Sequence, residues 1–124
     1  MPFGHLISLI TLYRIFALSI IDFTILESGQ SLSESVAKRL EDAKTCHCDY
    51  HLHSNITRFD NELLEELPSL FDLGVSSFKV FTTYKDAGMM LTYDQIEKVA
   101  AVLAEGGGLL MVHAEDDKIV ADAS

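Results

Sequence analysis

Apolar and polar positions change their spacing along this chain, and the change divides it into short strands and longer helices. Runs that favour extended structure lie at 19–25 (SIIDFTI), 46–56 (CHCDYHLHSNI), 75–83 (VSSFKVFTT) and 109–113 (LLMVH). Such short runs, rich in β-branched and apolar residues, are typical of strands. Between them, apolar residues recur every three or four positions, which predicts amphipathic helices. The chain therefore predicts four strand–helix units in succession.

The expected helices carry start and stop signals. Ser31 with Glu34, and Thr92 with Gln95, form capping boxes that satisfy backbone amides at a helix start. Asp60 is placed to cap the middle helix, in which a proline predicts a kink. That proline is Pro68, and the expected stops are Gly74 and the glycines 106–108.

Strands that alternate with amphipathic helices predict an α/β fold, in which helices lie outside a parallel sheet. Two closures fit this pattern: an open doubly wound sheet and part of a (β/α)8 barrel of the TIM type. No G-x-G-x-x-G follows the first strand, so a dinucleotide-binding fold has no support. A barrel needs about 250 residues, so about four βα units make a partial one. We divide the chain into 1–18, an apolar segment of unclear origin, and 19–124, an α/β domain that under the second closure is a partial barrel.

Charge and cysteine content narrow the class of protein. The net charge is −10, which argues against nucleic-acid and anionic-membrane partners. A single residue separates Cys46 from Cys48, and such a close pair rarely forms a good disulfide. We therefore expect a reduced, cytoplasmic location. The apolar run at 5–26 is long enough to span a membrane, but it lacks the positive start of a signal peptide and contains Arg14. We expect a buried helix or strand there, with a membrane segment as the alternative.

Three residues in or directly after the predicted strands are candidates for chemistry. Lys79 lies inside an apolar strand, where burial of the ammonium is costly unless a carboxylate, a Schiff base or a metal-ligating carbamate relieves it. His113 ends the fourth strand, at the edge where parallel barrels carry their active sites. Tyr84 follows the third strand and can donate a hydrogen bond to a developing oxyanion. The alternatives are a lysine that reaches solvent, a histidine bonded to a loop carbonyl and a half-buried aromatic.

Four segments in order, IDFTILESGQSL, CDYHLHSNIT, SSFKVFTTYKD and GGLLMVHAEDD, resemble the cyclic amidohydrolases, in the dihydropyrimidinase and hydantoinase branch. The resemblance runs from about residue 20 to about residue 120. It implies a zinc-dependent barrel in which Lys79 is carboxylated and bridges two zinc ions, His113 ligates one of them, and Tyr84 contacts the substrate. It also implies hydrolysis of the cyclic amide C–N bond of dihydropyrimidines or hydantoins by a metal-bridging hydroxide, and homo-oligomers in intact relatives.

The resemblance also leaves parts of that site without a counterpart. The family has an H-x-H ligand pair far upstream of the lysine, and a further histidine and an aspartate beyond the stretch that matches here. We therefore expect a central fragment that is inactive alone, with a non-catalytic interaction or assembly protein as the alternative. The family strand that corresponds to DYHLH carries no ligand. A metal site formed by His47, Asp49, His51 and His53 on one strand face stays open as a separate alternative.

Overall fold

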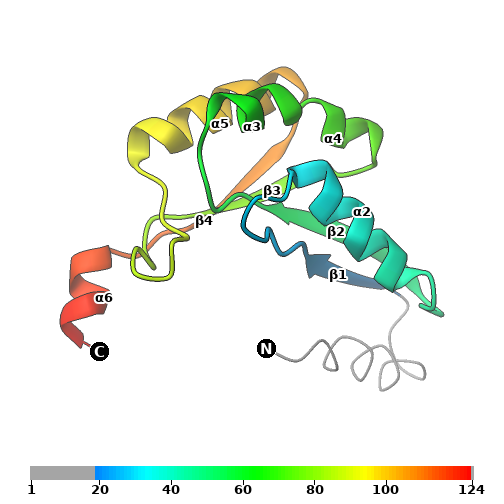
Figure 1. Cartoon of the computed structure of the whole chain (residues 1–124), viewed down its shortest axis with the longest axis horizontal. Helices are drawn as coiled ribbons and strands as arrows, with labels where there is room; N and C mark the ends of the chain where they lie inside the picture. Colours follow the sequence, from blue (N-terminus) through cyan, green and yellow to red (C-terminus); the bar gives the residue numbers. More distant parts are fainter. Residues whose placement is uncertain (1–18, 124) are drawn as a thin grey trace.

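The computed structural model describes residues 19–123, so the segment at 1–18 lies outside it (Figure 1). Strands and helices follow one another in the order β1 (Ser19–Phe23), α2 (Leu32–Ala43), β2 (Asp49–Asn55), α3 (Asn61–Glu66), α4 (Ser69–Asp72), β3 (Ser77–Phe81), α5 (Tyr93–Glu105), β4 (Leu109–His113) and α6 (Asp117–Ala123). The four predicted strand–helix units are confirmed. No helix in 19–123 is long and apolar enough to cross a membrane.

The sheet is parallel throughout, and its strand order β1-β2-β3-β4 is the order along the chain. Each crossover therefore moves one strand onward in the same direction. Helices α2, α3, α4 and α5 all lie on one face of the sheet (Figure 1). A doubly wound sheet reverses its strand order and carries helices on both faces, whereas a barrel does neither. The arrangement is that of four consecutive units of a (β/α)8 barrel.

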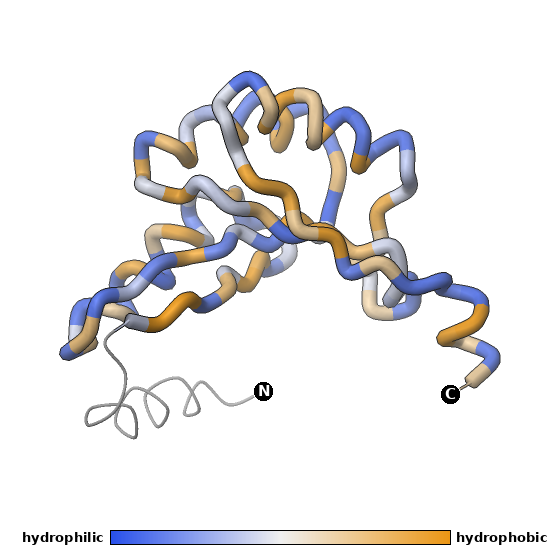
Figure 2. Tube along the Cα trace, turned by 180° about the vertical axis from the view of Figure 1, so that it is seen from behind, coloured by the Kyte–Doolittle hydropathy of each residue, from blue (hydrophilic) through white to orange (hydrophobic). Residues whose placement is uncertain are grey.

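The core lies between the sheet and these helices. Every second strand residue points toward it, and Leu52, Phe78 and Val80 are almost completely buried there. Burial of a large apolar side chain contributes about 1.5–3 kcal/mol, so this layer supplies most of the stability. Figure 2 shows apolar and polar residues interspersed along the same tube. The helices contribute Leu32, Val36, Leu63, Leu67, Leu70, Val99 and Leu103 to the core.

The helix signals in the sequence are confirmed. Both capping boxes form, at the starts of α2 and α5. Asp60 accepts a hydrogen bond from the Leu63 amide at the start of α3. Pro68 stands between α3 and α4, so the predicted kink divides one helical stretch into two. Gly74, after α4, has φ +83°, a left-handed conformation that favours glycine.

Glu66, at the end of α3, caps the start of α2 from a distance in sequence. Its two carboxylate oxygens accept hydrogen bonds from the backbone amides of Leu32 (2.9 Å) and Ser33 (2.8 Å). Burial alone would raise the pKa of the Glu66 carboxyl, but the hydrogen bonds from Ser33 and Leu32 outweigh it and lower the pKa. The carboxylate therefore links two helices on the outer layer.

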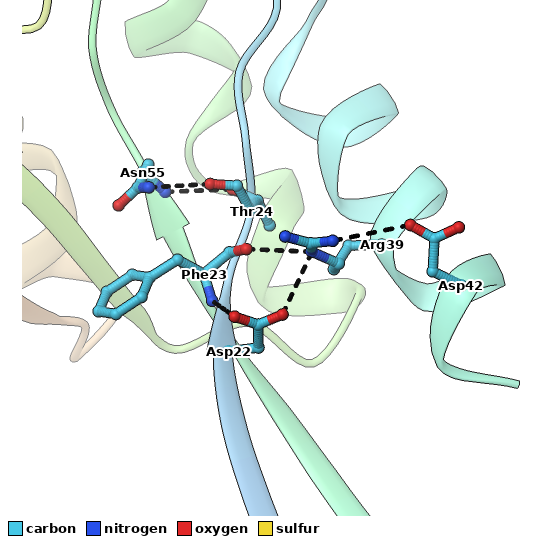
Figure 3. A network of polar contacts seen from close by, with 6 residues as sticks. All are labelled: Asp22, Phe23, Thr24, Arg39, Asp42 and Asn55. Carbon is cyan, nitrogen blue, oxygen red and sulfur yellow. Dashed lines mark hydrogen bonds and ion pairs between the residues drawn. The ribbon is translucent and has the colours of Figure 1, made fainter. Parts of the chain in front are cut away.

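Arg39 of α2 secures the carboxyl end of β1 (Figure 3). Its Nε donates to the Phe23 carbonyl at 3.1 Å and lies 3.4 Å from a carboxylate oxygen of Asp22. On the other side of β1, the Asn55 amide nitrogens of backbone and side chain donate to the Thr24 hydroxyl and carbonyl at 3.1 and 2.9 Å. The end of β1 is thus held between a helix and its neighbouring strand.

The Glu66 cap makes stability depend on pH. Its folded pKa is lowered, so its contribution is complete above the unfolded value of about 4.3 and is lost as the pH falls through the folded pKa. We expect Glu66→Gln to lower the free energy of unfolding by about 1 kcal/mol at neutral pH. Urea unfolding near neutral and at strongly acidic pH measures this difference, which should shrink on acidification. Glu65→Gln, on the exposed side of α3, is the control; equal losses in both variants would contradict the role of Glu66.

Candidate functional site

The face of the sheet opposite the helices carries most of the polar side chains that the sequence singled out. The strand register aligns Phe23 with His53, Asn55 with Lys79, and Phe81 with His113. Because aligned residues of parallel strands point to the same side, and the intervening residues fill the core, these side chains share the opposite face. We call it the open face; it comprises Ile21, Phe23, Asp49, His51, His53, Asn55, Ser77, Lys79, Phe81, Leu109, Met111 and His113.

Lys79 lies in the middle of β3 on the open face and is half-buried. Phe78 and Val80 are buried on the helix side and Ser77 and Phe81 are buried on the other side, so Lys79 lies inside a buried strand, as the sequence predicted. The Lys79 Nζ lies 5.3 Å from the ring centroids of both Phe23 and Phe81. This distance is within cation–π range, so two aromatic rings flank the amine. Within 19–123 it forms no ion pair, so the carboxylate partner that the sequence allowed is not among these residues.

His113 and Tyr84 come together beyond the carboxyl ends of β3 and β4. Their ring centroids are 5.3 Å apart, and Phe81 lies 5.7 Å from His113 and 6.1 Å from Tyr84. The His113 Nε2 is 2.7 Å from a carboxylate oxygen of Glu115. A metal ion that bound this nitrogen would have to displace the Glu115 contact, whereas no hydrogen bond to the other ring nitrogen forms within residues 19–123. Phe81 therefore connects Lys79 to the pair formed by His113 and Tyr84.

Tyr84 has a left-handed backbone with φ 65°, which is uncommon for a residue with a side chain. The chain around it is anchored to the segment after β4. The Thr82 hydroxyl donates to the carbonyls of His113 (3.0 Å) and Glu115 (2.7 Å). A strained conformation at a candidate site persists when the surrounding contacts over-determine it. The tyrosine is thus positioned by the loop, and its ring is turned toward His113.

His53 is a neighbour of Lys79 that was expected only as part of the DYHLH stretch. Its Nδ1 lies 2.5 Å from the Ser77 hydroxyl, and its ring centroid is 5.1 Å from that of Phe23. Burial lowers the pKa of the His53 imidazole, and the positive charges of His51 and Lys79 lower it further. The histidines of β2 and the lysine of β3 therefore belong to one electrostatic environment.

The DYHLH stretch forms β2, and Asp49, His51 and His53 lie on the open face. His47 precedes the strand, in a bend. In residues 19–123, no three or more histidine, cysteine, aspartate or glutamate side chains are arranged to hold a metal ion. Cys46 and Cys48 are free thiols ahead of the strand. Within the described residues, the structure therefore does not support the alternative metal site at His47, Asp49, His51 and His53.

Sequence reasoning missed the immediate surroundings of Lys79. Phe23 and Phe81 were counted as strand residues, and Asn55 was not singled out. The Asn55 side-chain oxygen is buried and has no hydrogen-bond partner among residues 19–123, and Asn55 is aligned with Lys79. The alternation of strand side chains was the available signal, since it places residues two apart on one face. Strand alignment, which the sequence did not provide, was needed to bring three strands together.

A hollow of about 480 Å³ lies at the carboxyl ends of the strands. The loops after β1, β2 and β3 line it, through Glu27, Asn55, Arg58 and Met89 among others. Its volume falls in the range of about 300–1,000 Å³ for small-molecule sites. Lys79 and His113 are not among its lining residues, so this hollow borders the open face rather than enclosing the candidate site.

The lowered pKa of His53 is directly measurable. We expect its imidazole to titrate below the ordinary value of about 6.5 in the folded chain, because burial and nearby positive charge oppose protonation. Because the unfolded chain then binds this proton more tightly, the folded state is most stable above the pKa that His53 has in the unfolded chain. It loses stability as the pH falls toward the lower pKa that His53 has in the folded chain. NMR titration, with the urea-unfolded chain as reference, gives both values. Lys79→Met should raise the His53 pKa; a folded midpoint at or above the unfolded one would refute this account.

Comparison with known proteins finds no matching family model. The chain is 37% identical over 108 residues to dihydropyrimidinase from Rattus norvegicus, covering 85% of this chain and 20% of that protein. It is 37% identical over 86 residues to dihydropyrimidinase-related protein 5 from Homo sapiens, covering 68% of this chain and 15% of that one. A solved D-hydantoinase structure superposes with a TM-score of 0.76 at 34% identity, over 86% of this chain and 25% of that chain.

These likenesses extend over most of the chain in both sequence and fold. The chain spans only 15–25% of the length of these relatives. The matched region contains the open face and the residues that the sequence singled out on it. Over most of its length, this chain is therefore similar in both sequence and fold to dihydropyrimidinases and D-hydantoinases.

Proposed function

We propose that this chain forms part of the barrel of a hydrolase that opens the cyclic amide C–N bond of dihydropyrimidines or hydantoins. One observation carries the proposal: Lys79, His113 and Tyr84 gather around Phe81, toward the carboxyl end of one sheet face. That end is where barrel enzymes carry their active sites. The names of the matched proteins, dihydropyrimidinase and D-hydantoinase, supply the class of reaction.

The proposed cofactor is zinc, as two ions in the complete site. His113 would hold one ion through its imidazole, and Lys79 would bridge both as a carbamate, formed from its neutral amine and carbon dioxide with loss of a proton. A catalytic zinc site typically has three protein ligands, so these two residues do not complete a dinuclear centre. The remaining ligands must come from outside the described residues. We therefore propose that residues 19–123 do not sustain ring opening by themselves.

Tyr84 is the proposed substrate contact. Its phenol would donate a hydrogen bond to the ring carbonyl as negative charge develops on the oxygen. The edge-on contact with Phe81 and the tilted contact with His113 restrict the tyrosine ring. A donor that is held in place before the reaction needs little reorganisation during it, which is why this type of contact contributes to rate.

A non-catalytic role in assembly is the second candidate. The match to dihydropyrimidinase-related protein 5, whose name specifies no reaction, favours it. Large apolar side chains on the open face also favour it, since Ile21 is 59% and Leu109 61% exposed. A homo-oligomer in a reducing cytoplasm would suit both candidates. Bound metal discriminates between them, because an assembly role needs none.

Metal content per chain, measured on purified protein of known oligomeric state together with hydantoin ring opening, tests the proposal. About two zinc ions per chain with turnover would support the hydrolase and contradict inactivity of the chain alone. Zinc at about one ion per chain, lost on His51→Ala but kept on Lys79→Ala, would favour the D-x-H-x-H alternative. Absence of both metal and turnover is the result expected for a barrel fragment that holds only two of the proposed ligands. Metal content and turnover of a full-length relative that carries this segment then separate the hydrolase from the assembly role.

Lys79→Ala should abolish bound metal and turnover in a full-length relative that carries this segment. The reason is that no other side chain on β3 can bridge two ions from that position. Atomic emission of the purified variant gives the metal content. Lys118→Ala, on the exposed side of α6, is the matched control. Full metal content and activity in Lys79→Ala would exclude the bridging role.

Tyr84→Phe should lower the turnover number by about 10²–10³-fold with little change in KM, because the lost hydrogen bond forms chiefly in the transition state. Steady-state kinetics on hydantoin or dihydrouracil measures both constants. Tyr93→Phe is the control, since Tyr93 is 79% exposed at the start of α5. An unchanged turnover number in Tyr84→Phe would reduce this tyrosine to a packing role.

A further inference from the structure

We propose that Asp117 is a positioning residue for Tyr84: its carboxylate clamps the residues on both sides of the tyrosine and holds it in its left-handed conformation. The clamp rests on the proposed function only in that Tyr84 is the substrate contact. Asp117 is the first residue of α6, beyond β4, and more than thirty residues from Tyr84 in sequence. The sequence offered no sign of this connection.

The clamp consists of two hydrogen bonds to the same oxygen atom. Asp117 Oδ1 accepts from the Thr83 hydroxyl at 3.1 Å and from the Lys85 backbone amide at 3.1 Å. Thr83 is fully buried, so water cannot readily replace its side of the clamp. Tyr84 lies between these two donors, so its backbone is fixed from both directions.

The conformation of Tyr84 needs such support. A φ of 65° brings the Cβ of a non-glycine residue close to its own backbone, so the free loop would favour other conformations. Two further bonds use the Tyr84 carbonyl, which accepts from the amides of Ala87 (3.1 Å) and Met89 (3.2 Å). Those bonds close the turn after the tyrosine, whereas Asp117 ties the tyrosine to the segment that follows His113. Together with the Thr82 bonds to His113 and Glu115, the carboxylate therefore fixes where the tyrosine lies relative to His113.

Helix α6 has a separate start signal, which makes the role of Asp117 separable from helix formation. Asp116 Oδ1 accepts from the amides of Lys118 (3.0 Å) and Ile119 (3.1 Å). A change at Asp117 thus removes the clamp and leaves that cap in place. Because a single Asp117 oxygen accepts both bonds, an amide can replace the carboxylate. Asp117→Asn should keep the clamp, whereas Asp117→Ala should release it.

Amide hydrogen exchange and ring–ring NOEs on the full chain test the clamp without any need for activity. In Asp117→Ala, we expect the Lys85 amide to exchange about tenfold faster and the NOE between the Tyr84 and His113 rings to weaken. Asp117→Asn and Asp122→Ala, the control on the same helix, should match the native chain. Loss of amide protection throughout β3 would show that Asp117→Ala fails to fold. In that case Asp117→Ser replaces it, because the serine hydroxyl is too short to reach both the Thr83 hydroxyl and the Lys85 amide.

The outcomes separate the clamp from the proposed function. If the Lys85 amide of Asp117→Ala exchanges at the native rate and its Tyr84–His113 NOE keeps the native intensity, the clamp is overturned, whatever the enzymatic activity. Failure of Asp117→Asn to restore them would overturn it as well. A clamp confirmed in a chain without ring opening, even in a full-length relative, would instead contradict the hydrolase. Where ring opening is measured, Asp117→Ala should lower the turnover number about tenfold, and Asp117→Asn should restore it.

Discussion

Burial of one face of the parallel sheet is the constraint on which the rest of the structure depends. Phe78 and Val80 are fully buried against the helical layer, and so the residues between them must point the other way. Lys79 is consequently placed on the open face by the packing of its neighbours, since no ion pair within the described part of the chain directs its side chain. Strand alignment then sets Asn55 beside it and Met111 on its other side. The core thereby determines the geometry of the candidate site.

On the open face, ionisable side chains are in contact with aromatic rings, whereas a sheet face that only meets solvent would not need such contacts. Two aromatic rings flank the Lys79 amine, and a third contact joins Phe81 to His113. The side-chain oxygen of Asn55 remains buried without a partner. Buried polar atoms in native proteins usually have partners, so an unpaired one beside the proposed metal-ligating lysine is consistent with a site for which further groups are needed.

The loops contribute a second level of organisation. Thr82, Thr83 and Lys85 are all bonded to the segment that follows β4, so the two loops behave as one unit. The strained backbone of Tyr84 is sustained by these contacts rather than by local preference. Rigid support on strands and tethered loops is what a precisely oriented donor requires.

Local signals in the chain were sufficient for its elements: both capping boxes, the kink at Pro68 and the glycine stop at Gly74 depend on contacts within a few residues, and all formed as expected. Strand–helix alternation also determined the fold class, and the motifs around Lys79 and His113 pointed to the family. Hydrophobic patterning alone left the barrel and the doubly wound sheet open; the family resemblance implied the barrel, and the strand order, which no local pattern encodes, then distinguished the two. The flanking of Lys79 by Phe23 and the reach of Asp117 to Tyr84 likewise join residues far apart in sequence, and only folding brings such groups within contact distance.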